Sequence, residues 1–231
     1  MSARSIISVT GEDRVRFLQA IVTQDVAKLN EDKIQFAALL TSQGKILHDM
    51  FLIDGDNSIF IDTQTAYADL LLKRLSLYKL RAKVTLAMAD APALTLPDPR
   101  HPALPPRDYT GDPDNQTQAR ALGIPELGVD FAPDAVVALD AGYDLLHAIS
   151  FTKGCYVGQE VTARMHYKNI ARRGFYVLQN DTLPPRLALL KFEEVEAAHG
   201  NITVDNQPYR ATLPGWMGPK FAQFKTLSEK Q

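Results

Sequence analysis

The stretch Ser150–Asn169, SFTKGCYVGQEVTARMHYKN, contains the only cysteine of the chain, Cys155. Gly154 and Gly158 bracket this thiol, and a helix-like run follows them. We therefore expect Cys155 close to a helix N-terminus, where the helix dipole and the cation of Lys153 both favour a thiolate. Because a lone cysteine is usually a small buried apolar residue, the rest of the chain must decide between the two interpretations.

The other polar residues of this stretch have structural as well as functional interpretations. Gln159 begins the helix-like run, and Glu160 precedes Arg164 by four residues, which is the spacing of an ordinary intrahelical ion pair. The two glycines are explained either as ordinary turn residues or as positions that a ligand or another backbone approaches closely. Tyr156 is expected to pack rather than to react.

The composition indicates an ordinary soluble protein of one or two compact units. The chain has 231 residues, of which 45% are hydrophobic and 23% charged, and its formal net charge is −2. This balance predicts neither a nucleic-acid partner nor an anionic membrane surface. No apolar run approaches the roughly 20 residues that span a bilayer, and no secretory segment is recognisable, so we expect a cytoplasmic protein without a membrane partner.

The cysteine and histidine content limits metal chemistry. One cysteine excludes an internal disulfide framework. An iron–sulfur cluster commonly needs about four protein ligands, mostly cysteines, so this chain is not expected to hold one alone. The five histidines show no paired metal-binding spacing, and no metal site is predicted. A Cys–His hydrolase with His166 lacks a nucleophile elbow and an orienting acid.

Residues 1–90 are predicted to form an antiparallel α+β unit that is ferredoxin-like in outline. Asp13 begins a helix whose apolar positions continue to Val26, and a second helix is expected over 66–80. Alternating apolar residues predict strands over 4–10, 34–40, 46–53, 58–62 and 83–88.

Three further segments follow. Residues 91–115 contain seven of the fourteen prolines and are interpreted as a connector. Residues 116–171 are predicted to form a second part of the body, with a strand-like run at 136–139, a helical face at 145–149 and the thiol motif. Residues 172–231 are predicted to form a small β module with a frayed tail.

Four stretches together resemble one family. They are GEDRVRFLQAIVTQDV at 11–26, LLTSQGKILHDMFL at 39–52, ARALGIPELG at 119–128 and SFTKGCYVGQEVTAR at 150–164. These motifs resemble the YgfZ family of folate-binding proteins, which includes the mitochondrial iron–sulfur assembly factor and is related to glycine-cleavage aminomethyltransferase. The resemblance implies an aminomethyltransferase-like folate-binding fold of the α+β class, followed by a small, apparently shortened C-terminal β-barrel. It also implies a tetrahydrofolate ligand and a role in assembling or repairing iron–sulfur proteins.

The resemblance assigns roles to particular residues. Glu126 matches the glutamate that aminomethyltransferases use on the pterin, whose adjacent N–H groups suit a bidentate carboxylate. Cys155 is then the functional thiol and Asp49 a second catalytic candidate. The remaining candidates for folate contacts are the neighbours of the thiol: Lys153, Gly154, Tyr156, Gly158, Gln159, Glu160 and Arg164.

The chain departs from the family pattern at four places. Gln24 replaces an asparagine within Thr23-Gln24-Asp25, a change we expect to be tolerated, and Asn169 replaces a glycine. His48 precedes Asp49 where related transferases have two adjacent acids, which weakens the case for one-carbon transfer because a general acid–base pair needs both groups. The C-terminal module lacks an extra pair of strands, so the sequence is compatible with either a closed or an unclosed barrel.

Three hypotheses follow. The leading one is a folate-binding accessory protein whose partners are a folate derivative and iron–sulfur assembly or client proteins. The competing one is a tetrahydrofolate-dependent one-carbon (aminomethyl) transferase or demethylase. The third is an interaction module whose ancestral pocket is filled. A basic run is interpreted as a solvated face without a site role: Lys73, Arg74, Lys79, Arg81 and Lys83.

Overall fold

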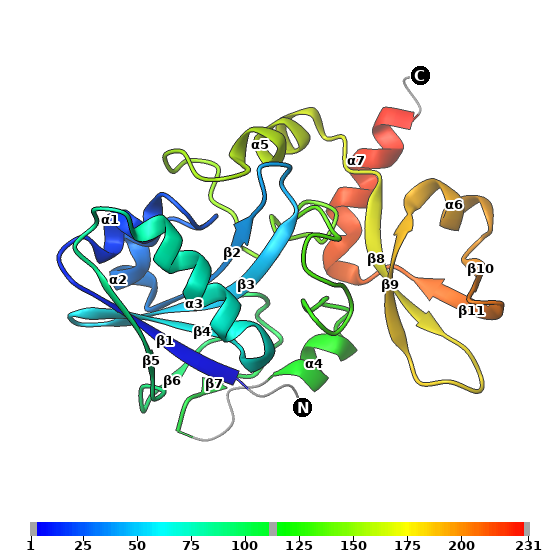
Figure 1. Cartoon of the computed structure of the whole chain (residues 1–231). Helices are drawn as coiled ribbons and strands as arrows, with labels where there is room; N and C mark the ends of the chain where they lie inside the picture. The colour runs from blue at the N-terminus through cyan, green and yellow to red at the C-terminus, as the bar shows by residue number, and fades with distance from the viewer. Residues whose placement is uncertain (1–3, 111–114, 229–231) are drawn as a thin grey trace.

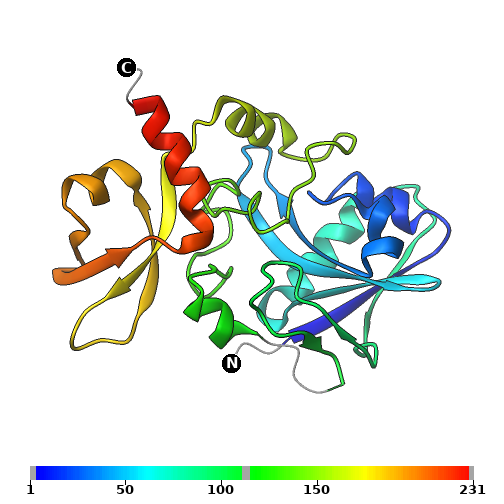
Figure 2. The same cartoon turned by 180° about the vertical axis from the view of Figure 1, so that it is seen from behind.

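The computed structural model describes residues 4–110 and 115–228, and Figures 1 and 2 show it from opposite sides. Residues 1–3, 111–114 and 229–231, which belong to the predicted first unit, connector and last unit, lie outside the described residues. A larger sheet and a smaller sheet lie at opposite ends of the molecule, with helices α5 (Gln159–Lys168) and α7 (Gly218–Ser228) between them (Figure 1).

The N-terminal sheet has five antiparallel strands in the order β2-β3-β4-β1-β5. Its strands are β1 (Arg4–Thr10), β2 (Ile34–Leu40), β3 (Ile46–Gly55), β4 (Ser58–Gln64) and β5 (Thr85–Ala89). Strands β5, β1, β4 and β3 follow the order of a ferredoxin-like βαββαβ unit, and β2 extends it as an additional edge strand. Buried apolar side chains lie on both faces of this sheet.

Each face of the sheet belongs to a different core. Helices α1 (Arg14–Gln19) and α3 (Thr65–Lys79) cover one face, where Ile7, Leu18 and Leu71 are fully buried. The other face packs against the segment between β5 and α5, which contributes Tyr143. Because neighbouring side chains of a strand point to opposite faces, β2 and β3 contribute to both cores.

The first helix is shorter than its apolar spacing predicts. It ends at Gln19, and Val26 lies instead in the 3-10 turn η1 (Val26–Lys28), which leads into α2 (Leu29–Asp32). Between them the chain turns to the edge of β2, where Thr23 N donates to Ala38 O at 2.9 Å. Ala38 N in turn donates to Thr23 Oγ1 at 2.8 Å. These tertiary hydrogen bonds replace the continuation of the helix.

The proline-rich segment is part of the folded body. Strands β6 (Thr95–Leu96) and β7 (Arg107–Asp108) pair with each other. Arg107 is 1% exposed, and its guanidinium binds Asp62 of β4 at 3.0 Å and Asp98 at 3.3 Å. The segment therefore covers the sheet with charged side chains, which its proline content did not predict.

Little regular structure follows until the thiol motif. Helix α4 (Gln116–Ala121) is present, and α5 spans Gln159–Lys168 after the thiol. The predicted strand at 136–139 forms only an isolated bridge between Lys45 and Val137, and the predicted helical face at 145–149 lies in turns and irregular backbone. Both predictions are wrong because these apolar residues fill the core under the sheet without repeating backbone geometry.

The C-terminal module is an open four-stranded sheet in the order β10-β11-β8-β9. Its elements are β8 (Arg173–Gln179), β9 (Arg186–Lys191), α6 (Phe192–Ala197), β10 (Asn201–Val204), β11 (Gln207–Thr212), η2 (Gly215–Met217) and α7 (Gly218–Ser228). Within the described residues β9 and β10 do not pair with each other, so the expected barrel is not closed. Most of the tail that we expected to be frayed forms helix α7. Its Lys220 ammonium donates hydrogen bonds to Leu139 O and to the Asp144 carboxylate, which attach the helix to the body.

Replacing Arg107 with methionine tests the structural role of the proline-rich segment. Arg107→Met leaves Asp62 and Asp98 without one buried cation, so the free energy of unfolding should fall by about 3–5 kcal/mol. Lys33→Met removes an exposed ion pair with Asp54 and should cost less than about 1 kcal/mol. Urea unfolding measures both, and equal losses would contradict a structural role for the buried cation.

Candidate functional site

The thiol lies on an exposed loop that is fixed at its base. Cys155 is exposed, whereas its neighbour Lys153 is 8% exposed. The Lys153 ammonium donates to Val22 O at 2.7 Å and to Gln24 O at 2.9 Å. It also lies 5.2 Å from the centre of the Tyr156 ring. The loop is therefore clamped to the segment that follows α1.

Lys153 has a positioning role in these contacts. Burial lowers the pKa of Lys153 to about 8, against an opposing effect of the nearby Asp25 carboxylate. At neutral pH the side chain keeps its proton and both hydrogen bonds. Its ammonium is directed at backbone carbonyls, and Cys155 lies three residues before Gly158, the residue preceding the helix. The thiol is thus outside the first helical turn, where the dipole acts most strongly.

Thr23 and Gln24, in the segment that follows α1, form hydrogen bonds with residues 147–150, which lead into the thiol loop. Ser150 N donates to Thr23 O at 3.0 Å, and Thr23 Oγ1 donates to Ala148 O at 2.6 Å. Gln24 Nε2 donates to His147 O at 2.6 Å. The glutamine that replaces the asparagine of the family pattern therefore still reaches a backbone acceptor.

The two glycines beside the thiol differ. Gly158 has a φ of +83°, and a Cβ there would lie 2.4 Å from Thr41 O. A Cβ on Gly154 would meet no atom within 4 Å. Position 158 therefore requires glycine, both for its backbone conformation and for its close approach to Thr41 O, whereas position 154 has room for a side chain.

The remaining motif residues show mostly structural contacts. Glu160 and Arg164 on α5 form an exposed pair at 3.7 Å, and Gln159 begins the same helix. Tyr156 is 7% exposed, and burial raises its pKa to about 12. Its hydroxyl finds no hydrogen-bond partner among the described residues. Its ring packs in the core, as predicted.

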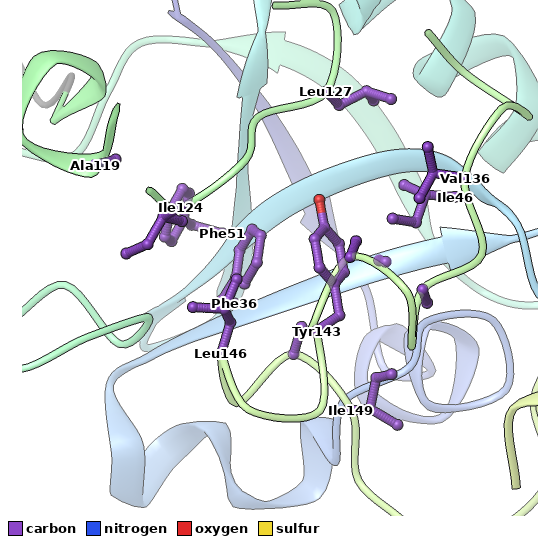
Figure 3. Close-up of a cluster of buried hydrophobic side chains, with 14 of the residues drawn as sticks. Phe36, Ile46, Phe51, Ala119, Ile124, Leu127, Val136, Tyr143, Leu146 and Ile149 are labelled. Carbon is purple, nitrogen blue, oxygen red and sulfur yellow. The ribbon is translucent and has the colours of Figure 1, made fainter. Parts of the chain in front are cut away.

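Glu126 and Asp49 belong to a second, buried cluster. Glu126 Oε1 accepts from Arg100 Nη1 at 3.1 Å, and Oε2 accepts from Gln116 Nε2 at 2.9 Å. Asp49 Oδ2 accepts from the Tyr143 hydroxyl at 2.8 Å, and burial raises the pKa of Asp49. Figure 3 shows Tyr143 inside the apolar cluster against the strands. The contacts of the described residues connect neither carboxylate to Cys155.

Sequence reasoning missed the cations of this cluster. The Arg100 guanidinium binds Asp98 at 2.8 Å and lies 5.1 Å from the centre of the Phe51 ring. Arg107 lies 3.8 Å from the same ring, and Tyr109 donates to Asp62 at 2.8 Å. No regular spacing in the proline-rich segment marks these residues in advance.

The buried cluster does not fit a pterin in this arrangement. Both oxygens of Glu126 already accept hydrogen bonds, so the bidentate contact expected from the resemblance would need Arg100 and Gln116 to withdraw. The aromatic face beneath is covered by Arg100 and Arg107. Four cavities with volumes of about 300–530 Å³ open among the described residues, and neither Glu126 nor Asp49 lines any of these four.

The described residues contain neither a cluster of metal ligands nor a helix that could span a membrane. In residues 4–110 and 115–228, no group of three or more His, Cys, Asp or Glu side chains could hold a metal ion. Within those ranges no helix has both the length and the apolar character needed to cross a bilayer. Cys155 therefore has no set of metal ligands around it in the described part of the chain.

The fold defines the chain as an aminomethyltransferase-like α+β protein. The crystal structure of glycine cleavage system aminomethyltransferase T from Bartonella henselae matches it with a TM-score of 0.56 at 11% sequence identity. The match covers 92% of this chain and 84% of that one. At this identity the likeness shows the fold alone.

The homologues of the chain are iron–sulfur cluster assembly factors. The mitochondrial IBA57 homolog of Pyricularia oryzae is 30% identical over 259 residues, covering 93% of this chain and 66% of the relative. The mouse and human IBA57 factors are each 26% identical and cover 76% and 80% of this chain, and 64% and 67% of their own lengths. The chain spans about half to two thirds of the length of the curated relatives that it matches. No protein-family model matches it.

These relatives correct the predicted cytoplasmic location and bear on the predicted family name. They are named as mitochondrial proteins, which contradicts the predicted cytoplasmic location. A near-neutral composition is too weak a basis for predicting a compartment. The YgfZ family name stays a prediction from the motif, whereas homology to the assembly factors is established.

The two glycines provide a matched test of the loop. Gly158→Ala should lower the free energy of unfolding by at least about 1–2 kcal/mol, because alanine at a positive φ is strained and its Cβ meets Thr41 O. Gly154→Ala should change it by less than about 0.5 kcal/mol. Urea unfolding of both variants checks this, and a larger loss for Gly154→Ala would show that the loop geometry is wrong.

Asp49→Asn tests the buried carboxyl through its pH dependence. Because burial raises the pKa of Asp49, the folded chain binds this proton more tightly than the unfolded chain. The stabilisation that this proton contributes is complete below the pKa of Asp49 in the unfolded chain, about 4, and is lost as the pH rises through the pKa of Asp49 in the folded chain. Asn keeps an acceptor for Tyr143 without the charge.

We therefore expect Asp49→Asn to be at least as stable as the unchanged chain at pH 7, with the difference shrinking toward pH 4. Urea unfolding at the two pH values measures it. A variant that is less stable at pH 7 than at pH 4, relative to the unchanged chain, would contradict the raised pKa.

Proposed function

We propose that this chain is an accessory protein for the assembly or repair of iron–sulfur proteins, in which Cys155 meets iron carried by a partner. The observation that carries this proposal is an exposed thiol on a loop whose base is fixed by Lys153. The names of the relatives support the process, and the single cysteine of the chain limits how it can take part.

The chemistry needs no redox step. The Cys155 thiol releases its proton to solvent, and the sulfur electron pair forms a bond to iron in place of an exchangeable ligand. The remaining ligands come from the partner, because the chain has no second cysteine. A loop that is held at its base presents this sulfur with little loss of conformational entropy on binding.

Tetrahydrofolate binding and one-carbon transfer remain predictions that rest on the resemblance. Glu126 would hold the pterin and Asp49 would act on the substrate, but Arg100, Gln116 and Tyr143 already occupy these carboxylates. The contacts therefore favour the third hypothesis for this region, a filled pocket, over a folate site. The thiol proposal does not depend on folate.

Cys155→Ser tests the role of the thiol. In a fungal strain whose own relative has been deleted, the unchanged chain, delivered to mitochondria, should restore the activity of iron–sulfur enzymes. Cys155→Ser should lose that restoration, whereas its free energy of unfolding should change by less than about 0.5 kcal/mol because the residue is exposed. Full restoration by the serine variant would exclude the thiol role.

Calorimetric titration with tetrahydrofolate tests the ligand. We expect no saturable heat from the folded chain, because a pterin must displace Arg100 and Gln116 from Glu126. A control titration with Glu126→Gln distinguishes specific from incidental binding. Saturable binding by the unchanged chain that is lost in Glu126→Gln would establish the folate site and contradict a filled pocket.

A further inference from the structure

The outer face of α3 carries large apolar side chains that no other part of the described chain covers. Leu70, Leu77 and Leu80 are 59%, 71% and 88% exposed. Leu70 and Leu77 lie on the same side of the helix, about 10 Å apart along its axis, and Leu80 follows its end. Exposed leucines that gather on one surface of a soluble protein indicate an interaction site more often than scattered ones do.

Unpaired cations lie among these leucines. Lys73 and Arg74 are on α3, between Leu70 and Leu77, and Arg81 follows Leu80. Among the described residues no carboxylate forms an ion pair with any of the three. Asp13, an acid that lines the cavity beside Arg81, already accepts a hydrogen bond from Lys83 N at 2.8 Å. The sequence alone indicates that this basic run is an ordinary solvated face. In the structure, however, exposed apolar side chains lie between its cations.

This surface is hollowed and reaches the thiol loop. One cavity of about 400 Å³ is lined by Leu70, Lys73, Arg74 and Leu77. A second, of about 440 Å³, is lined by Leu80 and Arg81 and, across from α3, by Val157 of the thiol loop. Tyr78 lines both cavities, so the two cavities adjoin at this side chain. We call these residues the α3 surface: Leu70, Lys73, Arg74, Leu77, Tyr78 and Arg81.

We propose that the α3 surface docks the iron-carrying partner through an acidic face with apolar side chains at its centre, which places the partner's iron beside Cys155. This inference rests on the proposed function and names the partner chemistry for the same thiol. Acidic groups complement the unpaired cations and set the orientation of docking, while the partner's apolar side chains fill the two hollows.

Other occupants fit less well. A small ligand is normally enclosed over most of its surface, whereas these leucines project outward along two open cavities. An anionic membrane attracts exposed leucines and cations too, but it offers no side chains to fill hollows. Val157 in the wall of the second cavity also connects the surface to the thiol, which a membrane contact would not require.

Two pairs of variants test the docking surface. Lys73→Glu and Leu77→Asp should lose the restoration of iron–sulfur enzyme activity in the deletion strain to the extent that Cys155→Ser does. Their matched controls are Arg210→Glu and Leu183→Asp, exposed residues of the C-terminal module, which should restore activity fully. Unchanged urea unfolding shows that each variant folds.

Photocrosslinking then identifies what occupies the surface. p-Benzoylphenylalanine at position 77 and at position 154 should capture the same acidic, iron-carrying protein in the same cells, and position 183 should not. Sedimentation with phosphatidylglycerol vesicles provides the membrane comparison.

The outcomes separate the two proposals. If Cys155→Ser loses activity while Lys73→Glu and Leu77→Asp keep it, the docking surface is wrong and the thiol role stands. Capture of different proteins at positions 77 and 154, or vesicle binding that Leu77→Asp removes, also overturns the docking proposal. If the unchanged chain restores no activity, the proposed function and the docking surface fail together.

Discussion

The pair of hydrogen bonds from the Lys153 ammonium to the carbonyls of Val22 and Gln24 joins the two halves of the body where the thiol emerges. A buried ammonium is costly unless its donors are satisfied, and here two carbonyls and an aromatic ring satisfy it. Thr23 completes the junction, because it binds both Ala38 of the central sheet and the backbone that leads into the loop. The exposed Cys155 thus sits on a fixed base.

The body also holds a second, very different polar site, which borders the same apolar core. Arg107 and Arg100 connect carboxylates from β4, the proline-rich segment and the turn that carries Glu126. Removing one partner from such a buried network leaves an uncompensated charge, so the network holds its own side chains in place. In a fold that resembles an aminomethyltransferase, the carboxylate of Glu126 is therefore already bound within the chain.

Much of the fold follows from local patterns in the sequence. Alternating apolar residues located the strands of the N-terminal sheet, and the helical spacing of Leu71 and Leu75 located α3. Tertiary contacts overrode these patterns elsewhere. The first helix stops at Gln19 because Thr23 binds β2, and the tail forms α7 because Lys220 binds Leu139 and Asp144. Neither partner is visible from local spacing.

The site was predictable to a smaller extent. The motif singles out Cys155 and the turn at Gly158 as candidates, but it does not show that Lys153 faces carbonyls 131 and 129 residues away in the chain, or that Glu126 is held by Arg100. Pairings between distant segments depend on the folded topology, and a single sequence has no periodicity that reports them. The basic run on α3 was recognised, whereas the apolar side chains exposed beside it became apparent only in three dimensions.

Native-state hydrogen–deuterium exchange at the Ser150 amide tests most directly whether Lys153 holds the thiol loop, because this N–H donates to Thr23 O beside the two carbonyls. In Lys153→Met the exchange of the Ser150 amide should rise at least about tenfold, which corresponds to about 1.4 kcal/mol, while strand β4 stays unchanged. Exchange at Ser150 that is the same with and without the lysine would contradict a clamped loop.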